Sequence, residues 1–81
     1  MQIRVQFYSY FKELTGCVET AETLPPGTTL GELHDRLMAE FPKLAAMKKS
    51  TLLAVGLDYQ SREYELKDGD EVSLFPPVQG G

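Results

Sequence analysis

The sequence predicts a small α+β domain in which a mixed sheet carries one main helix on one face and continues into an extended C-terminal tail. Residues near the start alternate between apolar and polar side chains. A later stretch repeats apolar residues every three or four positions behind a capping box, and a last strand follows tight-turn residues shortly before the end. A chain of 81 residues can form one core but leaves little interior for a deep pocket. We therefore expect any chemistry to be peripheral or shared with a partner.

The first half of the chain predicts two strands and a connector. Residues 2–9 alternate as a strand with one buried face does. Residues 10–15 are expected to form one helical turn that Gly16 ends, because glycine adopts the left-handed conformation at little cost. Residues 18–24 are rich in Thr and Val and predict a second, half-exposed strand, which a Pro-Pro-Gly sequence ends. The two strands are expected to form a hairpin.

The clearest helix signal is a capping box at Thr29 and Glu32. The Thr hydroxyl can accept from the backbone N–H three residues on, while the Glu carboxylate reaches back to the Thr amide. Behind it runs an apolar stripe that is expected to lie across the sheet, and Pro42 ends the helix or begins a final irregular turn. The stripe consists of Leu30, Leu33, Leu37, Phe41 and Leu44, and the residues expected to face water are Glu32, Asp35, Arg36 and Glu40.

The second half predicts three further strands. Residues 52–55 form a short apolar run, expected to be a buried strand at the centre of the sheet, that ends at Gly56. Residues 57–61 are expected to turn, and residues 63–66 to form a short edge strand or a turn. Residues 71–75 are the last strand, after tight-turn residues.

This order of elements predicts the ubiquitin-like β-grasp arrangement, in which the first and last strands lie parallel in the middle of the sheet. We place the β-grasp domain at residues 1–75 and a projecting tail at residues 76–81. The fold by itself does not decide the function.

Charge and cysteine content narrow the class of protein. Twelve acidic against eight basic residues give a net charge of −4, which argues against nucleic acid or an anionic membrane as the main partner. Cys17 is the single cysteine, so the chain cannot form an internal disulfide and fits a reducing compartment. With no membrane-spanning apolar run and no secretion signal in the sequence, we expect a cytoplasmic protein.

The tail is the most informative segment. Its two prolines lack amide donors and fix φ, so they stop sheet pairing and direct the chain away from the body as a stiff, extended segment. The valine after them is an apolar anchor, the glutamine is neutral and polar, and the two glycines have no side chains to clash inside a narrow channel. The residues expected to thread into another protein are Pro76, Pro77, Val78, Gln79, Gly80 and Gly81.

The terminal carboxylate of Gly81 is the expected reactive group. A carboxylate is a poor electrophile at neutral pH, because its charge repels nucleophiles and oxide is a poor leaving group. As a mixed anhydride with AMP, its carbonyl can be attacked by sulfur or an amine, and glycine offers the least steric hindrance to that attack. A Gly-Gly dipeptide alone favours the simpler interpretation of a frayed terminus.

The context of the dipeptide favours the reactive interpretation. Residues 75–81 read Phe-Pro-Pro-Val-Gln-Gly-Gly and directly follow a β-grasp strand. Together with the opening strand at 3–8, the segment 11–16, the helix from Thr29 and the run Asp-Gly-Asp-Glu-Val at 68–72, they make the whole chain resemble the MoaD family. This family comprises the small sulfur-carrier subunits of molybdopterin synthase and is related to the thiazole sulfur carrier and to ubiquitin. The paired prolines favour the molybdenum-cofactor branch, because the thiazole carriers usually lack them.

The resemblance implies a reaction cycle at Gly81. An E1-like adenylyltransferase would use ATP and Mg to make a glycyl adenylate, and sulfur from a donor protein would replace AMP. The resulting thiocarboxylate would donate sulfur to cyclic pyranopterin monophosphate in the large subunit of molybdopterin synthase, within a heterotetramer of two small and two large subunits. The catalytic side chains would belong to the large subunit, so this chain would be a non-catalytic, sulfur-donating subunit with no permanently bound cofactor.

Other interpretations remain open at this point. The same activated terminus would serve a ubiquitin-like modifier joined to lysines or a thiazole-pathway carrier, and a β-grasp binding module could carry an inert tail.

Other residues are assigned structural or docking roles. Cys17 is expected to be a small core or surface residue, and His34 a partly exposed helix residue without metal-ligand neighbours. The acids Asp68, Asp70 and Glu71 match ordinary turn residues. For Phe75 and Val78, which lie beside a chain end, partner docking is favoured over core packing.

Overall fold

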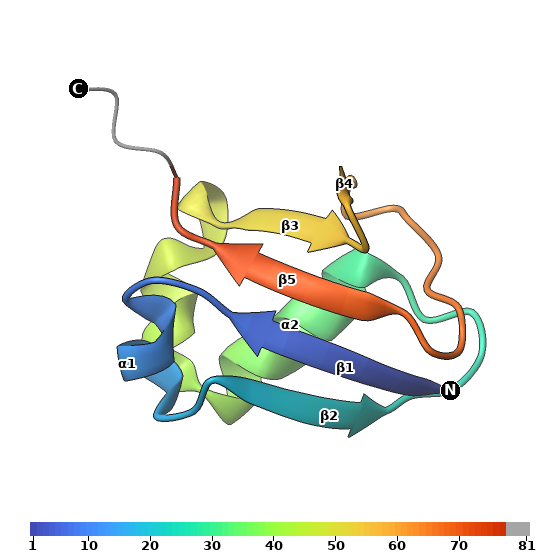
Figure 1. The fold of residues 1–81 in the computed structure, drawn as a ribbon, viewed down its shortest axis with the longest axis horizontal. Helices are drawn as coiled ribbons and strands as arrows, with labels where there is room; N and C mark the ends of the chain where they lie inside the picture. Colours follow the sequence, from blue (N-terminus) through green and yellow to red (C-terminus); the bar gives the residue numbers. More distant parts are fainter. Residues whose placement is uncertain (78–81) are drawn as a thin grey trace.

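The computed structural model describes residues 1–77 and confirms the α+β class. Figure 1 shows a five-stranded sheet with a helix lying across it. In chain order the elements are β1 (Gln2–Phe7), α1 (Phe11–Thr15), β2 (Glu19–Thr23), α2 (Leu30–Glu40), the 3₁₀ helix η1 (Pro42–Ser50), β3 (Leu52–Val55), β4 (Asp58–Tyr59) and β5 (Glu71–Phe75).

The sheet has the order β2-β1-β5-β3-β4. The first and last strands, β1 and β5, pair in parallel, with Arg4 opposite Glu71 and Phe7 opposite Leu74, while all other pairs are antiparallel. This is the β-grasp topology that the order of elements predicts. The middle position belongs to β5, however, and the prediction that residues 52–55 form the central strand is wrong, because only the short β4 lies beyond β3.

The helix α2 begins where the capping box places it. The Glu32 N–H donates to the Thr29 hydroxyl (3.2 Å), and the Thr29 N–H donates to the Glu32 carboxylate (2.9 Å). The helix ends at Glu40. Pro42 then begins the 3₁₀ helix η1, where the sequence predicts an irregular turn. Four members of the apolar stripe are fully buried and the fifth, Phe41, is half-buried.

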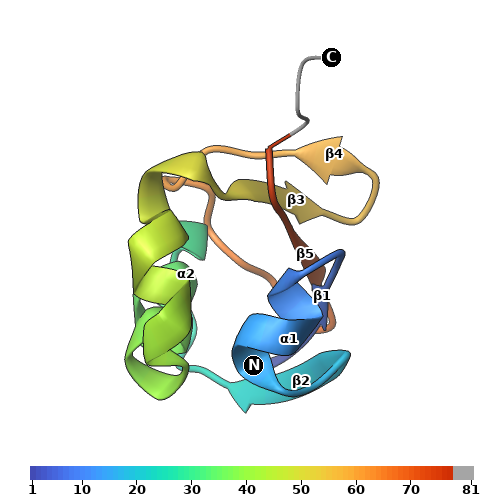
Figure 2. The ribbon, with the colours of Figure 1, turned by 90° about the vertical axis from the view of Figure 1, so that its left-hand side faces the viewer.

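The core lies between α2 and one face of the sheet. Figure 2 shows α2 on one side of the sheet and, within the described chain, no helix covering the other side. Strand residues alternate accordingly, so that every second side chain enters the core and its neighbours face the open side. The strand residues in the core are Ile3, Val5, Phe7, Leu53, Val55, Val72 and Leu74.

The part of the chain between β3 and β5 differs from the prediction. Gly56 has φ 61° and opens a two-residue turn, so Asp58 folds back opposite Val55 and the short edge strand lies at Asp58–Tyr59, within residues expected to turn. Residues 60–66, here called the strap, instead cross the start of α2, and only Glu65 makes an isolated bridge. The strap carbonyls of Tyr64 and Arg62 accept the Leu30 and Gly31 N–H groups (2.7 and 2.8 Å), which have no partner inside the helix.

One charged side chain is buried on β2. Glu22 is only 7% exposed although its strand was expected to be half-exposed, and its carboxylate accepts from the Arg36 Nε of α2 at 2.7 Å. This ion pair joins β2 to the helix. Burial raises the pKa of the nearby Glu40, and a hydrogen bond shared with the Glu22 carboxylate raises it further, because both disfavour the charged form of Glu40.

Within residues 1–77, no helix is both long enough and apolar enough to cross a bilayer.

Candidate functional site

The tail begins at the end of β5. Phe75 is the last residue of that strand and lies opposite Leu52 of β3. Pro76 and Pro77 are half-buried and belong to no strand, as expected of residues that lack an amide donor. The other predicted tail residues, Val78, Gln79, Gly80 and Gly81, lie outside the described residues.

Two tyrosines hold the Phe75 ring on the open face of the sheet. Val72 and Leu74 of β5 enter the core, so the alternation places Ser73 and Phe75 on the opposite face. The Tyr8 ring stacks on Phe75 with 4.7 Å between centroids and 15° between planes. The Tyr59 ring of β4 meets it edge-on, at 6.3 Å and 70°.

These rings border a groove of about 360 Å³, here called the open-face groove. Two small residues, Ala54 and Ser73, form part of its lining and are buried although they face away from the core. At its rim Tyr59 is 68% exposed and Leu57 is fully exposed. Apolar side chains gathered on an uncovered face, directly beside the tail, are typical of a protein interface. The full lining is Tyr8, Ala54, Gly56, Leu57, Tyr59, Glu71, Ser73 and Phe75.

The described residues do not assemble a metal site. Across residues 1–77, no three His, Cys, Asp or Glu side chains lie close enough together to hold a metal ion. Cys17 is half-buried and packs against the core, with its Sγ 3.6 Å from the Thr15 hydroxyl, which fits the small structural residue predicted.

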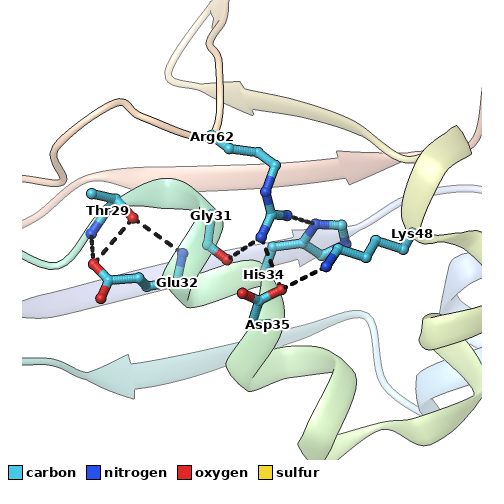
Figure 3. Close-up of polar contacts among 7 residues, drawn as sticks. All are labelled: Thr29, Gly31, Glu32, His34, Asp35, Lys48 and Arg62. Carbon is cyan, nitrogen blue, oxygen red and sulfur yellow. Dashed lines mark hydrogen bonds and ion pairs between the residues drawn. The ribbon is translucent and has the colours of Figure 1, made fainter.

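His34 is not the partly exposed residue that the sequence predicts, because its side chain is 2% exposed. Figure 3 shows its ring beside Arg62 of the strap, with Asp35 and Lys48 next to the pair. The Arg62 Nη1 lies 2.9 Å from the His34 Nδ1, and its Nη2 donates to the Gly31 carbonyl (3.0 Å) and to the Asp35 carboxylate (2.8 Å). A guanidinium only donates, so Nδ1 accepts and the ring proton is on Nε2, which has no partner among the described residues.

Burial, together with the positive charge of Arg62, lowers the pKa of His34 to about 4. The hydrogen bond from Arg62 lowers the pKa of Asp35. Lys48 Nζ lies 3.5 Å from the same carboxylate. These contacts fasten the strap to α2. None of the residues involved lines the open-face groove, so we assign them to structure and not to the site.

The site therefore consists of an uncovered aromatic groove beside the strand from which the tail leaves. Sequence patterns identify Phe75, Pro76 and Pro77, whereas the contribution of Tyr8 and Tyr59 depends on strand pairing. Tyr8 lies 67 positions before Phe75, and no local pattern indicates that the two rings meet.

The chain matches a protein-family model over residues 5–81, and the family is described as the ThiS family. The chain belongs to the ThiS family. Curated relatives span its full length. A molybdopterin synthase sulfur carrier subunit of Chlamydomonas reinhardtii is 34% identical over 84 residues, with all of both chains covered. One of Escherichia coli is 36% identical over 81 residues, covering 98% of this chain and 99% of the relative.

Solved structures agree with this family membership. A putative molybdopterin converting factor, subunit 1, from Pyrococcus furiosus superposes with a TM-score of 0.89 at 29% identity, covering 96% of this chain and 99% of the other. A complex of subunits 1 and 2 of the molybdopterin-converting factor from Helicobacter pylori matches with a TM-score of 0.74 at 28% identity, with both chains fully covered. The ThiS-family chain thus shares its ubiquitin-like β-grasp fold with proteins of comparable length.

Proposed function

We propose that this protein is the sulfur carrier subunit of molybdopterin synthase. The observation that carries the proposal is the uncovered aromatic groove at the end of β5. In this chain of the ThiS family, β5 is directly followed by Pro76-Pro77 and the sequence Val-Gln-Gly-Gly. A carrier needs a surface that a partner can recognise and a chain end that can leave that surface to reach a distant active site. The full-length relatives named as this subunit support the same assignment.

The chemistry is assigned to the carboxylate of Gly81. Its oxygen attacks the α-phosphorus of ATP in an E1-like adenylyltransferase, and pyrophosphate leaves with Mg²⁺ balancing the phosphate charge. The terminal sulfur of a persulfide on a donor protein then attacks the glycyl carbonyl, and AMP leaves. A second thiol attacks the donor-side sulfur of the resulting acyl disulfide, so that the S–S bond breaks, a disulfide forms with the donor and the thiocarboxylate is released. ATP and Mg²⁺ belong to the activating partner in this scheme, and this chain holds neither permanently.

The second partner is assigned as the large subunit of molybdopterin synthase. The thiocarboxylate donates its sulfur there to cyclic pyranopterin monophosphate, and two such deliveries build the dithiolene. The Helicobacter pylori relative in complex with its subunit 2 supports a partner of this kind. The assembly that we propose is a heterotetramer of two small and two large subunits. Phe75, Tyr59 and Leu57 supply the apolar docking surface, while residues 76–81 thread into the partner.

The two parts of the chain have separate tasks in this proposal. Residues 1–75 form the β-grasp body that docks, and residues 76–81 form the tail that reacts. Glycines at positions 80 and 81 suit a narrow channel, because no side chain blocks the approach of ATP or sulfur to the carbonyl.

Intact-mass measurement tests the proposal directly. The chain with a native C-terminus is incubated with the activating enzyme, Mg-ATP and a sulfur donor, and we expect one terminal oxygen to be exchanged for sulfur. The variant lacking Gly81 should fold normally but neither gain sulfur nor support pterin sulfuration. Formation of lysine-linked conjugates without any thiocarboxylate would contradict the carrier function and favour a ubiquitin-like modifier.

A further inference from the structure

Tyr8 occupies a fixed position beside the last residue of β5. Because Phe7 is opposite Leu74 in the parallel register, the next side chains along the two strands are those of Tyr8 and Phe75. The Tyr8 N–H donates to the Leu74 carbonyl (3.2 Å), and its carbonyl accepts from the Phe11 N–H (3.1 Å). Both backbone groups of Tyr8 are therefore hydrogen-bonded.

The residue after Tyr8 adds to this constraint. Ser9 has φ 55°, and in the described chain it is the one residue other than glycine with a positive φ. A side chain disfavours that conformation, so surrounding contacts must hold it. The Lys12 N–H donates to the Ser9 carbonyl at 3.2 Å, which contributes to holding the sharp turn into α1.

The Phe75 ring is held from two sides. Tyr8 stacks on it nearly parallel at 4.7 Å, and Tyr59 approaches edge-on at 6.3 Å. Both geometries are favoured for aromatic pairs. The buried Ala54 and Ser73 beneath the open face leave room for the rings to lie close to the sheet.

We propose that Tyr8 is a positioning residue for the tail. By stacking on Phe75, it fixes the residue from which Pro76 leaves the sheet. The two prolines have fixed φ angles and transmit that orientation, and the four residues after Pro77 span at most ~14 Å. Fixing the start of so short a segment restricts the region that Gly81 can reach, which raises its effective concentration at a partner's active site. The inference rests on the proposed function.

Three variants separate stacking from other roles of Tyr8. Tyr8→Ala removes the ring, and Tyr8→Phe keeps the ring without the hydroxyl. The matched control is Tyr10→Ala, which removes a similarly exposed tyrosine whose ring packs on Phe11 and does not line the groove. Thermal unfolding of each variant first establishes that it folds.

The first readout uses the free chain. Backbone ¹⁵N relaxation reports fast motion of the Phe75 and Val78 amides. We expect larger amplitudes in Tyr8→Ala and wild-type amplitudes in Tyr8→Phe and Tyr10→Ala. Unchanged motion of Phe75 in Tyr8→Ala would overturn the inference.

The second readout is the rate of thiocarboxylate formation over a range of carrier concentrations, which gives kcat and KM separately. Loss of one aromatic pair predicts a kcat about 2- to 10-fold lower for Tyr8→Ala, with Tyr8→Phe close to wild type. A raised KM with unchanged kcat would show that Tyr8 only docks, and a loss in Tyr8→Phe equal to that in Tyr8→Ala would show that its hydroxyl acts. Either result overturns the positioning role. If wild type acquires no sulfur, the proposed function fails, and the relaxation data alone decide whether Tyr8 fixes the strand end.

Discussion

Gly31 is a residue at which the absence of a side chain matters. A Cβ there would lie 2.9 Å from the Arg62 Cβ and 3.0 Å from the Arg62 carbonyl oxygen. That carbonyl also accepts the Gly31 N–H, so the strap cannot move away without losing a hydrogen bond. The close approach of strap and helix therefore depends on glycine at this position.

Gly31→Ala is expected to destabilise the domain. Alanine favours the helix by up to about 1 kcal/mol, but overpacking against backbone costs about 1–3 kcal/mol, so the net free energy of unfolding should fall. Urea denaturation at pH 7 measures the change, and hydrogen exchange at the Leu30 and Gly31 amides locates it. Equal stability of variant and wild type would mean that the strap relaxes freely.

His34 makes the free energy of unfolding depend on pH in a direction that can be predicted. Its pKa is about 4 in the folded protein against an ordinary value of 6.5, so between these values the unfolded chain binds more protons. The free energy of unfolding should therefore fall as the pH is lowered from 6.5 to 4, by up to about 3 kcal/mol. Protonation of Nδ1 removes the acceptor of Arg62 and places two cations together.

Urea denaturation at pH 7 and pH 4.5 tests this. We expect His34→Gln, which does not titrate, to be less stable than wild type at pH 7 but to lose less stability on acidification. The carboxylate of Asp35, whose pKa is lowered by Arg62, contributes its own loss only at lower pH. A wild-type protein as stable at pH 4.5 as at pH 7 would contradict the assignment.

At the scale of elements, α2 is defined by contacts at its first turn. The capping box satisfies the Glu32 N–H, and the strap satisfies the two donors before it, the N–H groups of Leu30 and Gly31, so the helix start is well fixed. Thr29→Ala should lower the free energy of unfolding by about 1 kcal/mol, whereas Thr29→Ser, which retains the hydroxyl, should not. Circular dichroism during thermal unfolding compares them, and equal losses in both variants would exclude the hydroxyl as the cause.

The elements that sequence patterns predict correctly are those whose signals are local. The capping box, the apolar stripe and the alternation of β1 lie within a few residues, and each gives the observed element. The edge strand was misplaced because β4 depends on the turn at Gly56 and has no buried side chain. No local pattern indicates the burial of Glu22 and His34. Their hydrogen-bond partners, Arg36 and Arg62, lie 14 and 28 positions away in the sequence. In the candidate site, the tail was identifiable and the tyrosines that border the groove were not.

At the scale of the whole molecule, the proposed division at residue 75 predicts that the body folds without its tail. Pro76 and Pro77 make no strand pairs, so a chain of residues 1–75 should unfold within about 0.5 kcal/mol of the full chain. Urea denaturation of both chains measures this, and the truncated chain should still bind the large subunit, although more weakly. A clearly less stable truncated chain would place the tail within the folded domain.

The position of β5 has a consequence for how this protein is made. The strand in the middle of the sheet follows every other element in the chain, and its partners β1 and β3 have no direct pairing with each other. A nascent chain that has not yet reached Glu71 can form α2 and the β1–β2 hairpin, but it cannot join the two halves of the sheet. A prematurely terminated product would therefore remain unfolded and open to proteolysis. The docking surface therefore forms only on chains that have already reached β5, the strand that immediately precedes the tail.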